Sequence, residues 1–171
     1  MTDVVTVAVR ARRLAACLLA TALVAVLGGC SLPAKAHLSK TASVILGMPV
    51  VLWLGDRAVT ATLIDTPPSR QFAAMLPLTV ELTDAWGQAK AGPLPRSLTV
   101  EGGVPVHDPT PGEVYFWPSN SMIAVYYDDL GQAVPDPGLI RLGVVKTGLD
   151  RLAAAGDRVT VRIEPAAATG P

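Results

Sequence analysis

The side chains that most often carry chemistry are few in this chain of 171 residues. The two cysteines, Cys17 and Cys30, both lie near the N-terminus, and the two histidines are His37 and His107. Beyond Cys30 the chain therefore offers no thiol for a disulfide, a metal site or a covalent intermediate. A serine-histidine-aspartate triad or a histidine-rich metal site would rest almost on His107 alone. We predict no catalytic set, no metal and no cofactor.

Arg96 and Arg141 are the candidates for recognising a polar group on a ligand. Arg96 follows Pro95 in an expected loop, and Arg141 lies in an expected strand. The planar guanidinium of arginine can bind a carbonyl oxygen or donate two parallel hydrogen bonds to a carboxylate. Each arginine has an alternative role as a partner in a surface or structural ion pair, and the sequence alone leaves both roles open.

Three aromatic residues, Phe72, Trp117 and Tyr127, are candidates for lining a ligand groove. Packing in the core or at its rim is the alternative for each, and for Phe72 on a helix face it is the favoured one. Trp117 opens the run Trp-Pro-Ser-Asn, which ends at Asn120 and is expected at the tip of a hairpin. Because loops on rigid scaffolds often carry function, Trp117 and Asn120 are the better candidates for a ligand site.

The N-terminal segment has the layout of a signal peptide. A basic block with Arg12 and Arg13 precedes an uncharged apolar run over residues 14–27. That run is shorter than the roughly 20 residues that a membrane-spanning helix needs. It ends in Leu-Gly-Gly-Cys, which resembles the bacterial lipobox, whose cysteine receives a diacylglyceryl group before cleavage.

These features predict a signal peptide over residues 1–29, lipidation of Cys30, and a tether over residues 30–46. Acyl chains hold a protein to a bilayer by about 0.8 kcal/mol for each buried CH₂ group. We therefore expect the domain to be anchored to the cell membrane on its extracytoplasmic face. An uncleaved membrane anchor is the alternative.

The charge balance excludes one class of partner. Lysine plus arginine and aspartate plus glutamate both number 14 in the whole chain. Without residues 1–29, which hold more basic than acidic side chains, the net charge is about −2. Nucleic-acid-binding domains are usually basic, and this chain has no basic cluster beyond its first residues. We predict no nucleic-acid partner.

The rest of the chain reads mostly as short strands, because apolar and polar side chains alternate between Gly and Pro turns. Strands are expected over residues 50–54, 59–63, 78–83, 98–100, 114–117, 122–127, 139–145 and 159–163. Gly143 is expected to interrupt its strand, and residues 91–96 are expected to form a loop. A short helix is expected from Thr66 to Leu76, and a second from Gly148 to Gly156. This pattern indicates a mainly β domain over residues 47–165, followed by a disordered tail over residues 166–171.

The order of several short stretches resembles the bacterial cyclophilin-like fold family. Residues 61–72 are similar to the opening of cyclophilins, where a strand ends in an acidic residue, a proline-containing cap follows, and a helix carries an inward phenylalanine. Further similar stretches are residues 72–82, 94–96, 111–114, 118–122 and 138–143. The resemblance extends over almost the whole domain and implies a closed β-barrel with two short helices.

Cyclophilins mark their isomerase groove with a Phe-His-Arg run, whose arginine contacts the prolyl carbonyl, and this chain lacks that run. The resemblance therefore implies a barrel without implying an activity. We expect a lipid-anchored binding module for a small molecule or a peptide. The alternative is an extracytoplasmic peptidyl-prolyl isomerase that uses Arg96 or Arg141. A protein–protein scaffold in the cell envelope is a third hypothesis.

Overall fold

The structure is a computed structural model that describes residues 47–167. The predicted signal peptide, the lipidation of Cys30, the tether and the tail beyond Ala167 lie outside the described residues. The described helices are α1 (Pro67–Ala73), α2 (Leu149–Ala153) and the 3₁₀ turn η1 (Pro118–Asn120). Within residues 47–167, no helix has the length and apolar character needed to span a membrane.

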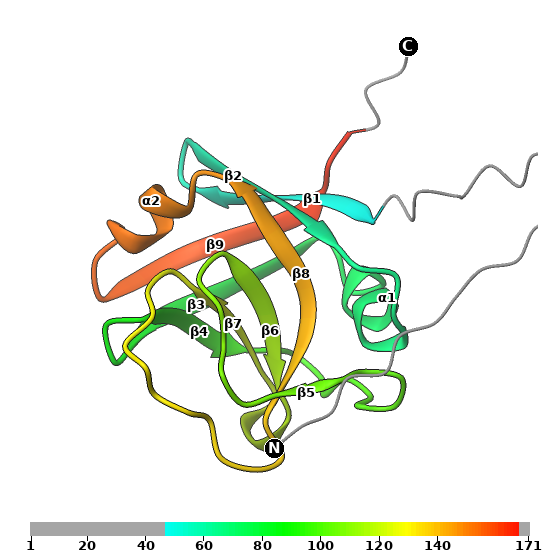
Figure 1. The fold of residues 1–171 in the computed structure, drawn as a ribbon. Helices are drawn as coiled ribbons and strands as arrows, with labels where there is room; N and C mark the ends of the chain where they lie inside the picture. Colours follow the sequence, from blue (N-terminus) through cyan, green and yellow to red (C-terminus); the bar gives the residue numbers. More distant parts are fainter. Residues whose placement is uncertain (1–46, 168–171) are drawn as a thin grey trace, which may run out of the picture. The chain divides into compact units, whose positions relative to one another are not determined.

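Nine strands make up a single sheet within the described part of the chain. They are β1 (Met48–Leu54), β2 (Arg57–Leu63), β3 (Leu78–Ala85), β4 (Ala89–Pro93), β5 (Pro105–Val106), β6 (Glu113–Trp117), β7 (Met122–Tyr126), β8 (Leu139–Thr147) and β9 (Arg158–Pro165). Neighbours follow the order β2-β1-β9-β3-β4-β7-β6-β8, and β8 pairs again with β2, which closes an eight-stranded barrel (Figure 1). β5 pairs with the first two residues of β8. The prediction of a mainly β closed barrel with two short helices is confirmed.

The barrel closes where β2 meets β8, and Gly143 faces Leu63 in that pairing. A Cβ atom on Gly143 would lie 2.6 Å from the carbonyl oxygen of Thr62, so only glycine allows the strands to approach this closely. β8 runs continuously from Leu139 to Thr147, so Gly143 does not end the strand as predicted, but its pairing with β6 shifts register there, since Val114 faces Gly143 and Tyr115 faces Arg141.

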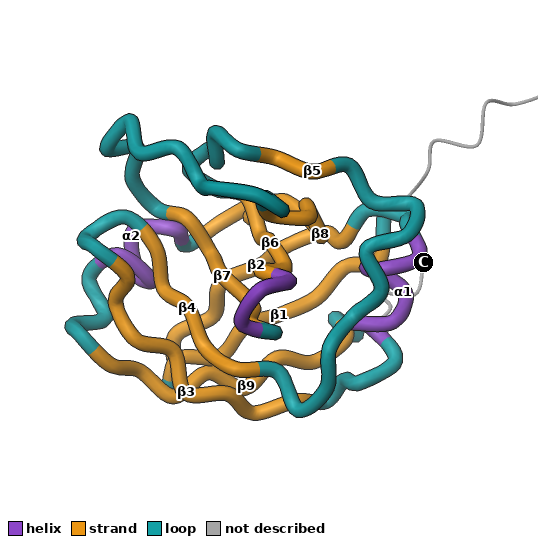
Figure 2. The backbone as a smooth tube through the Cα atoms, turned by 90° about the horizontal axis from the view of Figure 1, so that it is seen from below, coloured by secondary structure: helices purple, strands orange, loops and turns teal. Residues whose placement is uncertain are grey.

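The first hairpin and the first helix follow local sequence signals. β1 and β2 pair along their whole length up to Leu54 and Arg57, and Gly55 adopts a φ of 65° in the turn between them. Helix α1 starts at Pro67 after Thr66, as predicted, but it ends at Ala73, earlier than expected. Figures 1 and 2 show α1 and α2 on opposite sides of the barrel.

Two further local predictions were wrong. The sequence predicts a loop over residues 91–96, whereas β4 (Ala89–Pro93) pairs with both β3 and β7. Its Ala-Lys-Ala-Gly-Pro sequence has low strand propensity, so its two neighbouring strands and not its side chains make it a strand. Residues 98–100 form no strand, although Leu98 is buried against the barrel.

The barrel wall buries apolar side chains on both faces. Successive side chains of a strand point to opposite faces, so Val114 and Phe116 of β6 join the interior core while Tyr115 points outward. The interior core also holds Phe72 from α1. The outer cluster comprises Ala89, Ala91, Tyr115, Ala124, Tyr126, Val134 and Leu139. Val134 belongs to residues 128–138, the loop between β7 and β8, so this loop covers part of the outer face of β4, β7 and β6.

Candidate functional site

A cleft of about 330 Å³ opens at the edge of this outer cluster. Its walls come from the β3–β4 turn, the end of β6, the end of β7 and the loop over residues 128–138. The lining residues are Trp86, Gln88, Trp117, Tyr126, Gln132, Ala133, Val134 and Pro135. We refer to it as the tryptophan cleft.

Trp86 and Trp117 form the aromatic side of the tryptophan cleft. Their ring centroids lie 5.7 Å apart, with the ring planes inclined at 52°. Trp86 is 62 % exposed, which is unusual for the largest apolar side chain, and its φ of 54° is a left-handed conformation that bulky residues rarely adopt. An exposed tryptophan held in a costly conformation is more typical of a binding surface than of a packing position.

Tyr126 is the most deeply buried residue of the cleft, at 1 % exposure. Its ring meets that of Tyr115 edge-on, with the centroids 5.5 Å apart and the planes at 87°. Burial raises the pKa of Tyr126. Burial, together with the hydrogen bond that the Tyr115 hydroxyl donates to Glu113, raises the pKa of Tyr115. Both phenols are therefore neutral near pH 7, and neither supplies a base.

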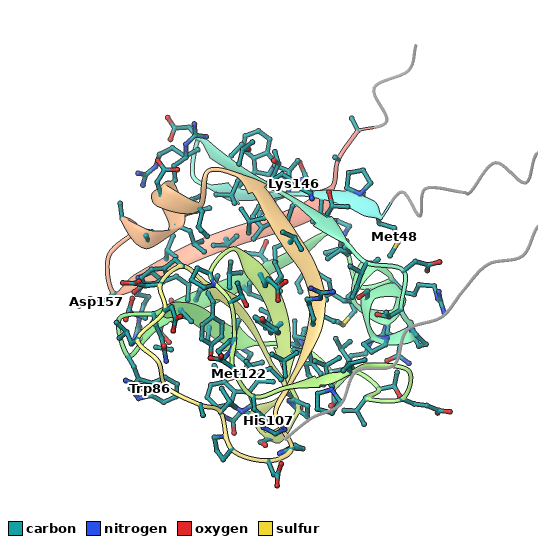
Figure 3. The ribbon with its side chains drawn as sticks, viewed as in Figure 1. Met48, Trp86, His107, Met122, Lys146 and Asp157 are labelled. Carbon is teal, nitrogen blue, oxygen red and sulfur yellow. The ribbon has the colours of Figure 1, made fainter. Side chains whose placement is uncertain are left out.

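His107 holds the loop wall of the cleft. The Val134 N–H donates to the His107 carbonyl oxygen at 2.7 Å, and His107 Nδ1 lies 2.8 Å from the Val134 carbonyl oxygen, so this nitrogen carries the proton. His107 Nε2 lies 3.7 Å from an Asp136 carboxylate oxygen. In Figure 3, Trp86 on the β3–β4 turn and His107, which follows β5, are labelled at separate places on the molecule. His107 therefore fastens this loop through hydrogen bonds at its carbonyl oxygen and its ring.

A cluster of polar side chains around Asp84 lies next to the β3–β4 turn. The Asp84 carboxylate accepts hydrogen bonds from Lys90 Nζ at 2.6 Å, from the Tyr127 hydroxyl at 2.5 Å and from the Gly87 N–H at 2.7 Å. Burial alone would raise the pKa of Asp84, but these hydrogen bonds outweigh it and hold the pKa below its usual value. Burial and the Asp84 carboxylate raise the pKa of Tyr127 to about 12.

The chemistry available in the tryptophan cleft is binding chemistry. None of the described residues that line it carries a formal charge, a thiol or an imidazole. Two glutamine amides, Gln88 and Gln132, supply hydrogen-bond donors and acceptors beside aromatic surface. Within residues 47–167, no three His, Cys, Asp or Glu side chains gather as metal ligands. This combination suits an uncharged ligand with a flat apolar part and an amide-like polar group.

Two other hollows are less suited to selective binding. One of about 550 Å³ lies over β1 and β9, but its polar groups already satisfy each other: Trp53 Nε1 donates to Glu164 at 2.8 Å, and Arg162 pairs with the same carboxylate at 2.6 Å. Another, of about 430 Å³, lies at the β2–β8 seam and includes Arg141. Arg141 donates to Glu113 at 2.7 Å, so its guanidinium is partly occupied.

The structure brings only one of the six predicted ligand residues into the tryptophan cleft, namely Trp117. Phe72 is 1 % exposed in the interior core, and Arg96 and Asn120 are exposed outside the cleft. Tyr127 points its hydroxyl at Asp84, and Arg141 lies at the β2–β8 seam. The predicted set does not converge on one pocket, because its members lie on different faces of the barrel.

Sequence reasoning missed Trp86, Gln88, Tyr126 and the loop over residues 132–135. One signal was present: a tryptophan directly before a glycine in a hairpin turn, where asparagine or aspartate is usual. The alternation in β7 also carried a signal, since Tyr126 falls on the face opposite Val125. Nothing local predicts that the loop over residues 132–135 folds against these side chains.

Comparisons with known proteins agree with this architecture. The model of the cyclophilin-like family matches residues 52–164. The solution structure of a hypothetical protein from Archaeoglobus fulgidus is similar, with a TM-score of 0.51 and 15 % sequence identity. That similarity covers 73 % of this chain and 99 % of the archaeal one. At this level of sequence identity, it shows a shared fold only. No curated protein matches the sequence.

Proposed function

The chain belongs to the cyclophilin-like family, and from that premise we propose that its barrel is a binding module whose ligand occupies the tryptophan cleft. The ligand is uncharged and carries a flat or ring-shaped apolar group, as in a small aromatic molecule or a neutral peptide segment. The observation that carries the proposal is the pair formed by Trp86 and Trp117 at the mouth of an uncharged cleft. Tryptophan supplies a large contact area with little conformational entropy to lose, which favours binding.

Binding has more support here than prolyl isomerisation. The isomerase hypothesis needs Arg96 or Arg141 beside an apolar groove. Arg96 is exposed and does not line the cleft, and Arg141 pairs with Glu113 at a different hollow. The cleft therefore lacks a cation that would polarise a prolyl carbonyl.

The mature protein, residues 30–171, tests the binding proposal. Mature protein labelled with ¹⁵N should give three indole N–H signals, one for each tryptophan. A panel of uncharged tetrapeptides, with and without proline, and of small aromatic amides is titrated in. Binding in the cleft shifts the signals of Trp86 and Trp117, while the signal of Trp53 stays in place because its indole is bonded to Glu164 on another face. A panel that moves none of the three signals, or that moves Trp53 alone, contradicts the proposal.

We further propose that the module is attached through a lipid on Cys30 to the extracytoplasmic face of the cell membrane. The support is the signal-peptide layout and the Leu-Gly-Gly-Cys sequence. Mass spectrometry of the membrane-extracted protein should find a diacylglyceryl group on an N-terminal Cys30. The variant Cys30→Ser should lose the lipid and leave the membrane fraction, and its continued retention there would contradict the attachment.

A further inference from the structure

Asp84 and Lys90 form an ion pair across the β3–β4 hairpin, where the two residues are directly opposite each other. Lys90 is 2 % exposed, so its ammonium group is almost wholly removed from water. Besides Asp84 it donates to the Gly156 carbonyl oxygen and lies 5.3 Å from the centre of the Tyr127 ring. Asp84 is the only carboxylate in residues 47–167 that pairs with this ammonium, and a buried charge without such a partner is strongly unfavourable.

The cluster joins three segments that are distant in sequence. The first is the β3–β4 turn, whose Gly87 N–H donates to Asp84. The second is the segment directly after β7, where Tyr127 donates its hydroxyl to Asp84 and the Tyr127 and Asp128 N–H groups both donate to the Gln88 carbonyl oxygen. The third is the turn between α2 and β9, whose Asp157 carbonyl oxygen accepts from the Asp84 N–H at 2.7 Å.

Two of these segments are walls of the tryptophan cleft. The β3–β4 turn carries Trp86, and the loop over residues 128–138 begins immediately after Tyr127. The turn has positive φ at both central residues, 54° at Trp86 and 72° at Gly87. A bulky residue enters that conformation only when its surroundings hold it there. The hydrogen bond from the Gly87 N–H to the Asp84 carboxylate is such a restraint, since it ties the turn back to β3.

We propose that Asp84 is a positioning residue, which sets the relative placement of Trp86 and the cleft loop while lying outside the cleft itself. Only the use of this placement for binding rests on the proposed function. The placement of Trp86 and the cleft loop by Asp84 exists with or without a ligand. None of the hydrogen bonds of the Asp84 side chain goes to a residue that lines the cleft. It acts through the backbone at Gly87 and through the Tyr127 hydroxyl.

The readout is the tryptophan pair itself. Two indoles whose ring centroids lie 5.7 Å apart and whose planes are inclined at 52° couple their excited states. This coupling produces an exciton couplet in far-ultraviolet circular dichroism. Trp86→Phe identifies this couplet by removing it. Asp84→Asn should lose most of the couplet while thermal unfolding stays cooperative. Ile163→Val, a core change in β9, should lower the melting temperature and leave the couplet intact, which separates positioning from stability.

A second variant keeps the test decisive if Asp84→Asn fails to fold. The double variant Asp84→Asn with Lys90→Gln removes both charges and leaves none buried without a partner. It should fold and should still lack the couplet. A folded variant of either kind that keeps the full couplet overturns the proposal, as does a wild-type protein without any couplet. None of these measurements uses a ligand. If the Asp84 variants lose the couplet but the cleft binds no ligand, the proposed function is refuted and the positioning role of Asp84 stands.

Discussion

Trp86 and Trp117 belong to different hairpins, yet their ring centroids lie 5.7 Å apart on the outside of the barrel. Strand order explains the approach, because β4 and β6 both pair with β7 and so bring the two hairpins together. Trp86 remains 62 % exposed in this arrangement. A tryptophan that gains little burial and adopts an unfavourable backbone conformation contributes little to folding, so its replacement should cost little stability.

Trp86→Asn should separate stability from binding. The change creates Asn-Gly, the dipeptide favoured in a hairpin turn with two positive φ angles. Relief of the backbone cost offsets the lost aromatic contact, so the free energy of unfolding should stay within about 1 kcal/mol of wild type. Any ligand that shifts the wild-type indole signals should lose affinity. Trp53→Phe is the matched control, and equal ligand affinity in Trp86→Asn and wild type would contradict the cleft assignment.

The three tyrosines should resist ionisation at the pH where free tyrosine titrates. The pKa of Tyr127 is raised to about 12, and those of Tyr115 and Tyr126 are raised as well. Phenolate absorbance of the folded protein should therefore stay low at about pH 10, and Tyr127→Phe should remove the component near pH 12. Because the folded pKa of Tyr127 exceeds the unfolded value, its stabilising contribution is complete below about pH 10 and disappears as the pH rises toward 12. Substantial phenolate absorbance in the folded protein near pH 10 would contradict this environment.

Asp84 should contribute to the loss of stability in acid. Its folded pKa lies below the ordinary value of 3.8, so its contribution is present above that value and is lost as the pH falls through the folded pKa. Below about pH 4, the free energy of unfolding should therefore fall more steeply with acidification in wild type than in Asp84→Asn. Urea unfolding at several pH values measures the two slopes. Glu81→Gln, which removes an exposed carboxylate of the same strand, should leave most of the wild-type slope, and equal slopes for wild type and Asp84→Asn would contradict the prediction.

His107→Ala should loosen the cleft loop without unfolding the barrel. The variant loses the hydrogen bond between Nδ1 and the Val134 carbonyl oxygen, which is worth about 1 kcal/mol. Hydrogen exchange of the Val134 N–H should become about fivefold faster, while β7 amides keep their protection. Asp108→Ala, at the exposed neighbouring residue, is the control. Unchanged exchange at Val134 in His107→Ala would show that other contacts hold the loop.

Much of the barrel could be predicted from local signals. The alternating strands, the Gly55 turn and the helix start at Pro67 each depend on residues that are close in sequence. β4 could not be predicted, because its alanines, lysine and glycine take strand geometry only between β3 and β7. Gly143 was misread for a related reason, since it marks a close approach to Thr62 on a different strand.

Local sequence patterns are enough to indicate a mainly β domain of the cyclophilin-like type, and the composition shows no thiol beyond Cys30 and a basic block with an apolar run before it. Which aromatic side chains share a surface, and which carboxylate neutralises Lys90, depends on the three-dimensional packing of the strands. Local patterns record which face of a strand a side chain occupies. They do not record which strands become neighbours, and the tryptophan cleft is made where the register of the barrel brings separate hairpins and one loop together.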